Sequence, residues 1–259
     1  MQVEFIDSMG SDMTVVNAAR ASFDRVKAGE FDQKDESLLL YLARGYSSED
    51  WEELMLRLME AAVGYHPEQP TSALANLVWE IKTKQTHFQP FAHPQLSFRM
   101  TLPLAIARQF WRSHVGASGG DCGYPAWSEK SFRYVDKMPS MFIPEQFRGR
   151  AANNKQGSEG FVPIPDDVDL HDLLAHQIDV YQKFIVAGVA PEMARFFLPQ
   201  NIETTFTWTG SLMFFARLAY LRNKSDAQRE CNEVMSLIEE HIKRLFPKSW
   251  EALMTGNIL

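Results

Sequence analysis

Apolar residues at helical spacing run through long stretches of this chain. Between residues 170 and 186, one face carries five apolar side chains, and Gly188 follows as a typical end signal. A second stripe follows Ser225, where Gln228 completes a capping-box pattern. The apolar residues of this second stripe are Ala227, Cys231, Val234, Ile238, Ile242 and Leu245. Because such helices must bury one face, the sequence predicts a helix-rich fold with a sizeable core.

Two short segments, residues 3–7 and 94–101, alternate apolar and polar residues with the periodicity of a strand. The second leads into a predicted helix over residues 102–114, with Thr101 as its N-cap. We find no internal repeat and no clear linker. We therefore expect one domain over residues 1–259, of a mixed, helix-rich α/β (α+β) class.

Local signals predict further segments. A buried helix beginning at Leu38 is expected to end at Gly45, and Ser48 is expected to cap a helix over residues 48–63. The remaining expected segments are a solvent loop at residues 27–36, a short helix opened by Pro191, and a helix at about residues 210–221.

Composition narrows the class of protein and of ligand. The 259 residues carry a net charge of −7, so we expect no general affinity for nucleic acid, and an anionic ligand needs a local basic cluster. No run of 18 apolar residues and no secretory signal is present, which predicts no membrane partner. Cys122 and Cys231 lie far apart without metal-ligand spacing, which favours a reducing compartment and a cytoplasmic location.

Six arginines lie in or beside apolar segments. Arg112 follows Arg108 and Gln109 at helical spacing, so it is adjacent to both. Ser131 and Arg133 lie two residues apart and point to one side if the segment is extended. The six are Arg108, Arg112, Arg133, Arg195, Arg217 and Arg222. Guanidinium groups with a hydroxyl suit a phosphate, whereas for any single arginine the alternative is an ordinary surface ion pair.

Common catalytic signatures are absent from the sequence. There is no HExxH, GxSxG, Walker A or GxGxxG motif, and no metal site is predicted. His93 and His114 are equally compatible with structural roles. Cys122 lacks an obvious activating neighbour, and Glu129 is a candidate for orienting a ligand or acting as a base.

Six segments, in order along the chain, are similar to one known family. Residues 107–112 match its Ala-Arg-Gln-aromatic-aromatic-Arg helix, and residues 128–134 match Asn-Glu-x-Ser-x-Arg-Tyr at Glu, Ser, Arg and Tyr. The other segments are residues 19–23, 91–93, 194–199, and 221–222 with 227–230. In this set the chain resembles the flavin-dependent thymidylate synthases, the ThyX family.

The resemblance implies a ThyX-like fold, helix-rich with a central, mostly antiparallel sheet. It implies a methyltransferase that carries a folate carbon to C5 of a pyrimidine deoxynucleoside monophosphate, deoxyuridylate (dUMP). FAD, methylenetetrahydrofolate and NADPH would be the cofactor and co-substrates. The family assembles its sites where subunits meet, so a homotetramer with shared active sites is expected.

The resemblance also assigns roles to residues of this sequence. The catalytic group would comprise Arg222, Gln109 and Glu129, with Arg222 polarising the pyrimidine carbonyl. Substrate binding would use Ser131, Arg133, Arg195 and Lys130, the first three on phosphate. Cofactor binding would use His93, Arg112, Ser113, His114, Ser211 and Arg217.

The chain departs from the family pattern at its signature, Arg-His-Arg followed seven residues later by Ser. Here Arg112-Ser113-His114 precedes Ser131 by sixteen intervening residues. Apparent insertions fall at about residues 46–86 and 119–127. These departures leave two alternatives open. One is a relative that methylates or hydroxymethylates dCMP or dUMP without flavin, and the other is a non-catalytic nucleotide-binding relative.

Overall fold

A computed structural model describes residues 1–63, 72–114, 126–131, 133, 138, 140–152, 157–224 and 226–256. The chain forms two compact units. The first comprises Met1–Asp7, Ser97–Thr209 and Leu221–Ile238, and the second comprises Ser8–Leu96, Gly210–Tyr220 and Glu239–Leu259. The expectation of a single domain over residues 1–259 stays a prediction.

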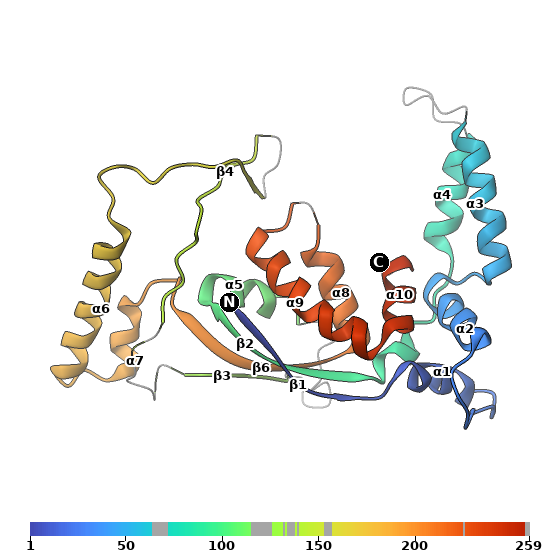
Figure 1. Cartoon of the computed structure of the whole chain (residues 1–259), viewed down its shortest axis with the longest axis horizontal. Coiled ribbons are helices and arrows are strands. Elements are labelled where there is room, and N and C mark those ends of the chain that lie inside the picture. The colour runs from blue at the N-terminus through green and yellow to red at the C-terminus, as the bar shows by residue number, and fades with distance from the viewer. Residues whose placement is uncertain are drawn as a thin grey trace. The chain divides into compact units, whose positions relative to one another are not determined.

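A four-stranded sheet carries the first unit's candidate site. Its strands are β1 (Gln2–Met9), β2 (Gln95–Pro103), β6 (Glu203–Ser211) and β3 (Ala126–Glu129), in the order β1-β2-β6-β3 (Figure 1). Strands β3 and β6 are antiparallel, with Trp127 opposite Trp208. The expected helix-rich fold with an antiparallel sheet is therefore confirmed.

Alternation along the strands puts one face of the sheet in the core. In β6, Phe206 and Trp208 are buried, and the intervening threonines are half-buried. Thr101 of β2 shares a hydrogen bond of 2.9 Å with Thr205 of β6. Because Thr101 pairs within the sheet, the prediction that it caps a helix is wrong. The helix that follows, α5, covers Leu104–Trp111 and is shorter than predicted at both ends.

The rest of the first unit is helical or irregular. Helix α6 (Leu170–Val186) has the predicted bounds, and Pro191 opens a short helix as expected. The other elements of this unit are α7 (Pro191–Ala194), η3 (Arg195–Phe197), β4 (Gly149–Arg150), β5 (Ser158–Glu159) and the start of α9 (Arg229–Leu245). Ser225 and Cys122 lie outside the described residues, as does most of the apparent insertion at 119–127.

Helices build the second unit. They are α1 (Asp12–Ala21), α2 (Gln33–Arg44), α3 (Ser48–Ala62), α4 (Ser72–Thr83), η1 (Gln89–Ala92), most of α8 (Leu212–Arg222) and α10 (Pro247–Thr255). Gly45 ends α2 as predicted, with a φ of 76°. The predicted loop at 27–36 is too long, because Asp32 caps α2 and Asp35 is buried against Arg20 and Lys27. The N-cap of α3 is Ser47 rather than Ser48.

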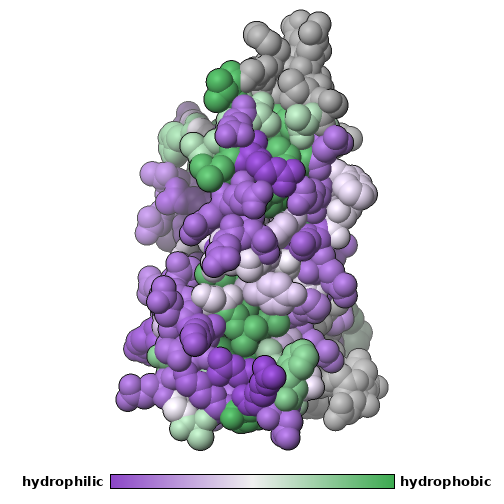
Figure 2. Space-filling view, turned by 90° about the vertical axis from the view of Figure 1, so that its right-hand side faces the viewer, coloured by the Kyte–Doolittle hydropathy of each residue, from purple (hydrophilic) through white to green (hydrophobic). Residues whose placement is uncertain are grey.

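Helices α3 and α4 form a hairpin within the apparent insertion at 46–86. Its core is built from Leu54 of α3, Leu77 of α4 and Tyr46, which lies just before α3. The surface that faces the viewer in Figure 2 is mainly hydrophilic, and apolar side chains emerge on it in separate patches. Met59 and Val63, near the end of α3, are among the exposed apolar side chains.

No helix of the described ranges has the length and apolarity needed to cross a bilayer. No group of histidine, cysteine and carboxylate side chains in the same ranges could hold a metal ion.

Candidate functional site

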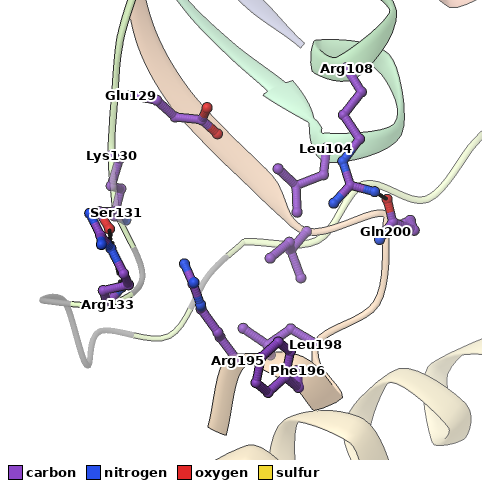
Figure 3. Close-up of a pocket in the computed structure, with 11 residues that line it drawn as sticks. Leu104, Arg108, Glu129, Lys130, Ser131, Arg133, Arg195, Phe196, Leu198 and Gln200 are labelled. Carbon is purple, nitrogen blue, oxygen red and sulfur yellow. Dashed lines mark hydrogen bonds between the residues drawn. The ribbon is translucent and has the colours of Figure 1, made fainter. Parts of the chain in front are cut away.

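The first unit contains a cavity of about 640 Å³ lined by several cations. In Figure 3, the side chain of Arg195 extends into the space between the segment carrying Ser131 and Arg133 and the opposite wall carrying Arg108. The full lining is Leu104, Arg108, Glu129, Lys130, Ser131, Arg133, Arg195, Phe196, Leu198, Gln200 and Ile202. Four basic side chains and one hydroxyl therefore face a common space.

The pairing of β3 with β6 positions one wall of this cavity. The ladder between β3 and β6 runs to Glu129, and the Lys130 N–H donates to the Thr205 carbonyl at 2.8 Å. The segment just after this last bond carries Ser131 and Arg133. The backbone N–H and Nε of Arg133 each donate to Ser131 Oγ at 3.3 Å, so the hydroxyl and the guanidinium lie together.

The other wall comes from α5 and η3. Arg108, in the last turn of α5, donates to Gln200 Oε1 at 2.6 Å. Arg195 begins η3, and its Nε donates to the Glu192 carbonyl at 3.3 Å. Within the described part of the chain, neither arginine forms an ion pair with a carboxylate. Their charge is therefore available to an anionic ligand.

Glu129, the carboxylate that lines this cavity, is held by two neighbours. Its Oε1 accepts from the Thr204 hydroxyl at 2.8 Å, and its Oε2 accepts from Trp127 Nε1 at 3.1 Å. The Trp127 ring in turn stacks on Phe206, with centroids 3.6 Å apart. The Glu129 carboxylate is thus oriented by hydrogen bonds to two uncharged donors of the sheet. The cavity lining contains more basic than acidic side chains, which suits a phosphate dianion.

A second cavity of the first unit, about 450 Å³, contains Arg222. Nη2 of Arg222, at the end of α8, donates to the backbone carbonyl of Gln109 and, at 2.7 Å, to Ser113 Oγ. Nε2 of Gln109 donates to Gln228 Oε1 at 2.6 Å. The lining also includes Lys224. This cavity offers hydrogen-bond donors and amides rather than the cluster of cations in the first.

Cys231 lies beside this second cavity and is fully buried. Its Sγ donates to Gln109 Oε1 at 3.4 Å. Burial raises the pKa of the Cys231 thiol to about 11. Because a nucleophilic cysteine must be present as thiolate, this raised pKa argues against Cys231 as a nucleophile.

The predicted site residues divide between these places. Glu129, Lys130, Ser131, Arg133 and Arg195 line the first cavity, while Gln109 and Arg222 line the second. Three residues that line these cavities were not among the predicted site residues. Gln200 and Gln228 were given no role in the site, and Arg108 was named only as one of the six notable arginines. Gln200 carries no signal in the sequence, because only the fold brings it to Arg108.

The residues predicted for the cofactor also separate. Arg112, Ser113 and His114 follow α5 in the first unit, where Arg112 and His114 are exposed. His93, Ser211 and Arg217 belong to the second unit. Ser211 is buried there, and its hydroxyl accepts the Phe214 N–H at 3.1 Å in the first turn of α8. Contact of these three with a cofactor stays a prediction.

The fold is shared with a nucleotide methylase of known structure. A UMP/dUMP methylase, PolB from Streptomyces cacaoi, solved with 5-Br dUMP, superimposes with a TM-score of 0.67 at 21% identity. The match covers 100% of this chain and 96% of the methylase. The two chains therefore share the same fold.

Sequence comparison identifies the family. The family described as thymidylate synthase complementing protein matches residues 4–248, and the chain belongs to this family. The flavin-dependent thymidylate synthase of Thermosipho melanesiensis is 24% identical over 259 residues, covering 98% of this chain and 91% of the relative. That of Thermus thermophilus is 26% identical over 251 residues, covering 96% and 74%.

Proposed function

We propose that this chain is a flavin-dependent thymidylate synthase that transfers a one-carbon unit from methylenetetrahydrofolate to C5 of dUMP. The observation that carries the proposal is the first cavity, where Arg108, Lys130, Arg133 and Arg195 line one space together with Ser131. Family membership and relatives named for this reaction support it. NADPH is the proposed source of reducing equivalents.

The first cavity would bind the 5′-phosphate. Arg133 and Arg195 present planar forks that donate to two phosphate oxygens at once, and the Ser131 hydroxyl beside Arg133 supplies a further donor. Lys130 would add a further positive charge to the cavity lining. Glu129, fixed by Thr204 and Trp127, would orient the sugar and base side of the nucleotide rather than compete for the cations.

Arg222 and Gln109 would act on the base. A guanidinium beside the pyrimidine carbonyl would polarise it and stabilise negative charge that develops on the ring. Gln109 has its amide fixed by Gln228 and Cys231, so it offers a rigid edge against which the ring can be placed. The residues of the chain would therefore contribute by positioning the nucleotide and by electrostatic stabilisation.

The donor set after α5 fits the diphosphate and flat ring of FAD. Arg112 and His114 are exposed donors two residues apart, and the ring of Trp111, 41% exposed, lies beside them. The Trp111 and His114 rings are 5.5 Å apart between centroids. Arg112 and His114 would hold the diphosphate, with Trp111 against a ring. Bound FAD would supply the two-electron reducing power that completes the methyl group.

We further propose a homotetramer in which two chains complete each site. Arg133 and Arg195 line one cavity of the first unit and Arg222 lines another. A single dUMP needs phosphate ligands and a ring ligand together. A symmetric assembly that brings the first cavity of one chain to the second cavity of its partner supplies both.

Release of tritium from [5-³H]dUMP tests the reaction directly. Protein reconstituted with FAD, NADPH and methylenetetrahydrofolate is expected to release tritium and form thymidylate in equal amounts. Omission of the folate is expected to abolish thymidylate. The variant R99A is a matched control, because the Arg99 and Glu4 side chains form an exposed ion pair. FAD-loaded wild-type protein that binds dUMP but forms no thymidylate would contradict the proposal.

A further inference from the structure

The guanidinium of Arg222 is docked on the carboxyl-terminal end of α5. Its Nη2 donates to the backbone carbonyl of Gln109, in the last turn of the helix, and to Ser113 Oγ at 2.7 Å. The carbonyls of a last helical turn lack intrahelical partners and carry the negative end of the helix dipole. The carboxyl-terminal end of α5 is therefore a favourable position for a cation.

Ser113 is itself fixed against this helix end. Its backbone N–H donates to the Phe110 carbonyl at 2.8 Å, and its hydroxyl donates to the Gln109 carbonyl at 3.4 Å. The hydroxyl oxygen remains able to accept from Arg222. Arg222, Ser113 and the Gln109 carbonyl thus form a closed group in which each member fixes the other two.

Other contacts around Arg222 restrain its backbone more than its guanidinium. Asn232 Nδ2 donates to the Arg222 carbonyl. The Phe110 ring centroid lies 6.0 Å from the guanidinium carbon, at the edge of cation–π range. Nε of Arg222 is buried and has no hydrogen-bond partner among the described residues. The orientation of the fork therefore depends on its Nη2 contacts.

We infer that Ser113 is a positioning residue that sets the Arg222 guanidinium toward the pyrimidine ring. The inference rests on the proposed function, and it gives Ser113 a different role from the cofactor contact expected from its place in Arg112-Ser113-His114. With Nη2 directed at the end of α5, the Nη1 edge is left for the ligand. A short hydroxyl suits this task, because it accepts from Arg222 while still donating to Gln109.

Binding of two ligands separates positioning from general damage. The ligands are dUMP and 2-deoxyribose 5-phosphate, which has the phosphate and sugar but no base. Each is titrated by calorimetry into wild type, S113A and S113T. For S113A, we expect the Kd of dUMP to rise about 10-fold and kcat to fall, because one charge-assisted hydrogen bond is lost. The Kd of 2-deoxyribose 5-phosphate is expected not to change, because its ligands lie in the first cavity.

S113T keeps the hydroxyl and is expected to retain wild-type affinity for dUMP. Two results would overturn the inference alone: S113A with wild-type dUMP affinity and kcat, or S113A weakened equally for both ligands. If S113A does not fold, loss of base-specific affinity in S113T would overturn it as well. Wild-type protein that does not bind dUMP at all would overturn the proposed function and the inference with it.

Discussion

Single residues in the first cavity are placed by short contacts, and part of this was predictable. The spacing of Ser131 and Arg133 predicts that hydroxyl and guanidinium point to one side, and they lie 3.3 Å apart. Arg108 shows the limit of such reasoning, because its partner Gln200 is remote in the sequence. Local spacing gives neighbours within a segment, whereas distant partners require the fold.

At this scale, R133A is expected to weaken dUMP binding while leaving the fold intact. Loss of a charge-assisted phosphate contact costs about 1.5–3 kcal/mol, or roughly 10- to 100-fold in Kd. Calorimetric titration of dUMP measures it. R99A removes an arginine paired on an exposed surface and is expected to bind normally. Equal affinities for R133A and R99A would place the phosphate elsewhere.

A second residue-scale prediction concerns thiol chemistry. Because burial raises the pKa of Cys231 to about 11, the group is protonated at pH 8 and shielded from reagents. In a C122S background, iodoacetamide at pH 8 is expected to leave native protein unlabelled. The same protein in denaturant is expected to label fully. Rapid labelling of the native form would mean that Cys231 is accessible as thiolate.

Secondary-structure elements were predictable where their pattern is long. Helix α6 has the bounds that its stripe predicts. Strand β6 was not predicted, although Phe206 and Trp208 alternate with threonines; the nearest predicted element after it was the helix at about residues 210–221. Thr101 was assigned to a helix cap because nothing local reveals its pairing with Thr205. Sheet pairing, which decides these boundaries, joins segments about a hundred residues apart.

At the element scale, Gly45→Ala tests the turn that ends α2. Gly45 has a φ of 76°, and a Cβ there would lie 2.3 Å from the Gln85 carbonyl oxygen. The variant is expected to lose more than the roughly 1–2 kcal/mol of left-handed backbone strain. Gly188→Ala is the matched control, because Gly188 has a φ of 83° and open space around its Cβ position. Urea unfolding measures both, and equal losses would contradict the clash.

On the scale of the whole molecule, an acidic chain carries a local basic cavity. The net charge of −7 excludes a general attraction for anions, and the cavity concentrates four cations from three segments of the chain. The family resemblance assigned Lys130, Arg133 and Arg195 to substrate binding and Arg222 to the base, but it did not indicate that they line separate cavities. Which cavity a segment lines depends on the tertiary fold, and no local sequence pattern reveals it.

Mixing two inactive variants tests shared sites at this scale. R133A loses one phosphate ligand and R222A loses the ring ligand, so each homo-oligomer is expected to be far less active than wild type at dUMP concentrations below the Kd of R133A. If one site takes Arg133 and Arg222 from different chains, random mixed oligomers contain about a quarter intact sites. Co-expression followed by the tritium-release assay measures the recovery. Activity of the mixture no greater than that of the separate variants would mean that each chain builds its own site.

The central claim is that the first cavity holds the phosphate of a pyrimidine nucleotide. Comparing dUMP with deoxyuridine by calorimetry, at low and high salt, tests it most directly because the two ligands differ only in the phosphate. We predict that dUMP binds at least about 100-fold more tightly and that the difference shrinks as salt rises. Equal, salt-independent affinities for dUMP and deoxyuridine would contradict the claim.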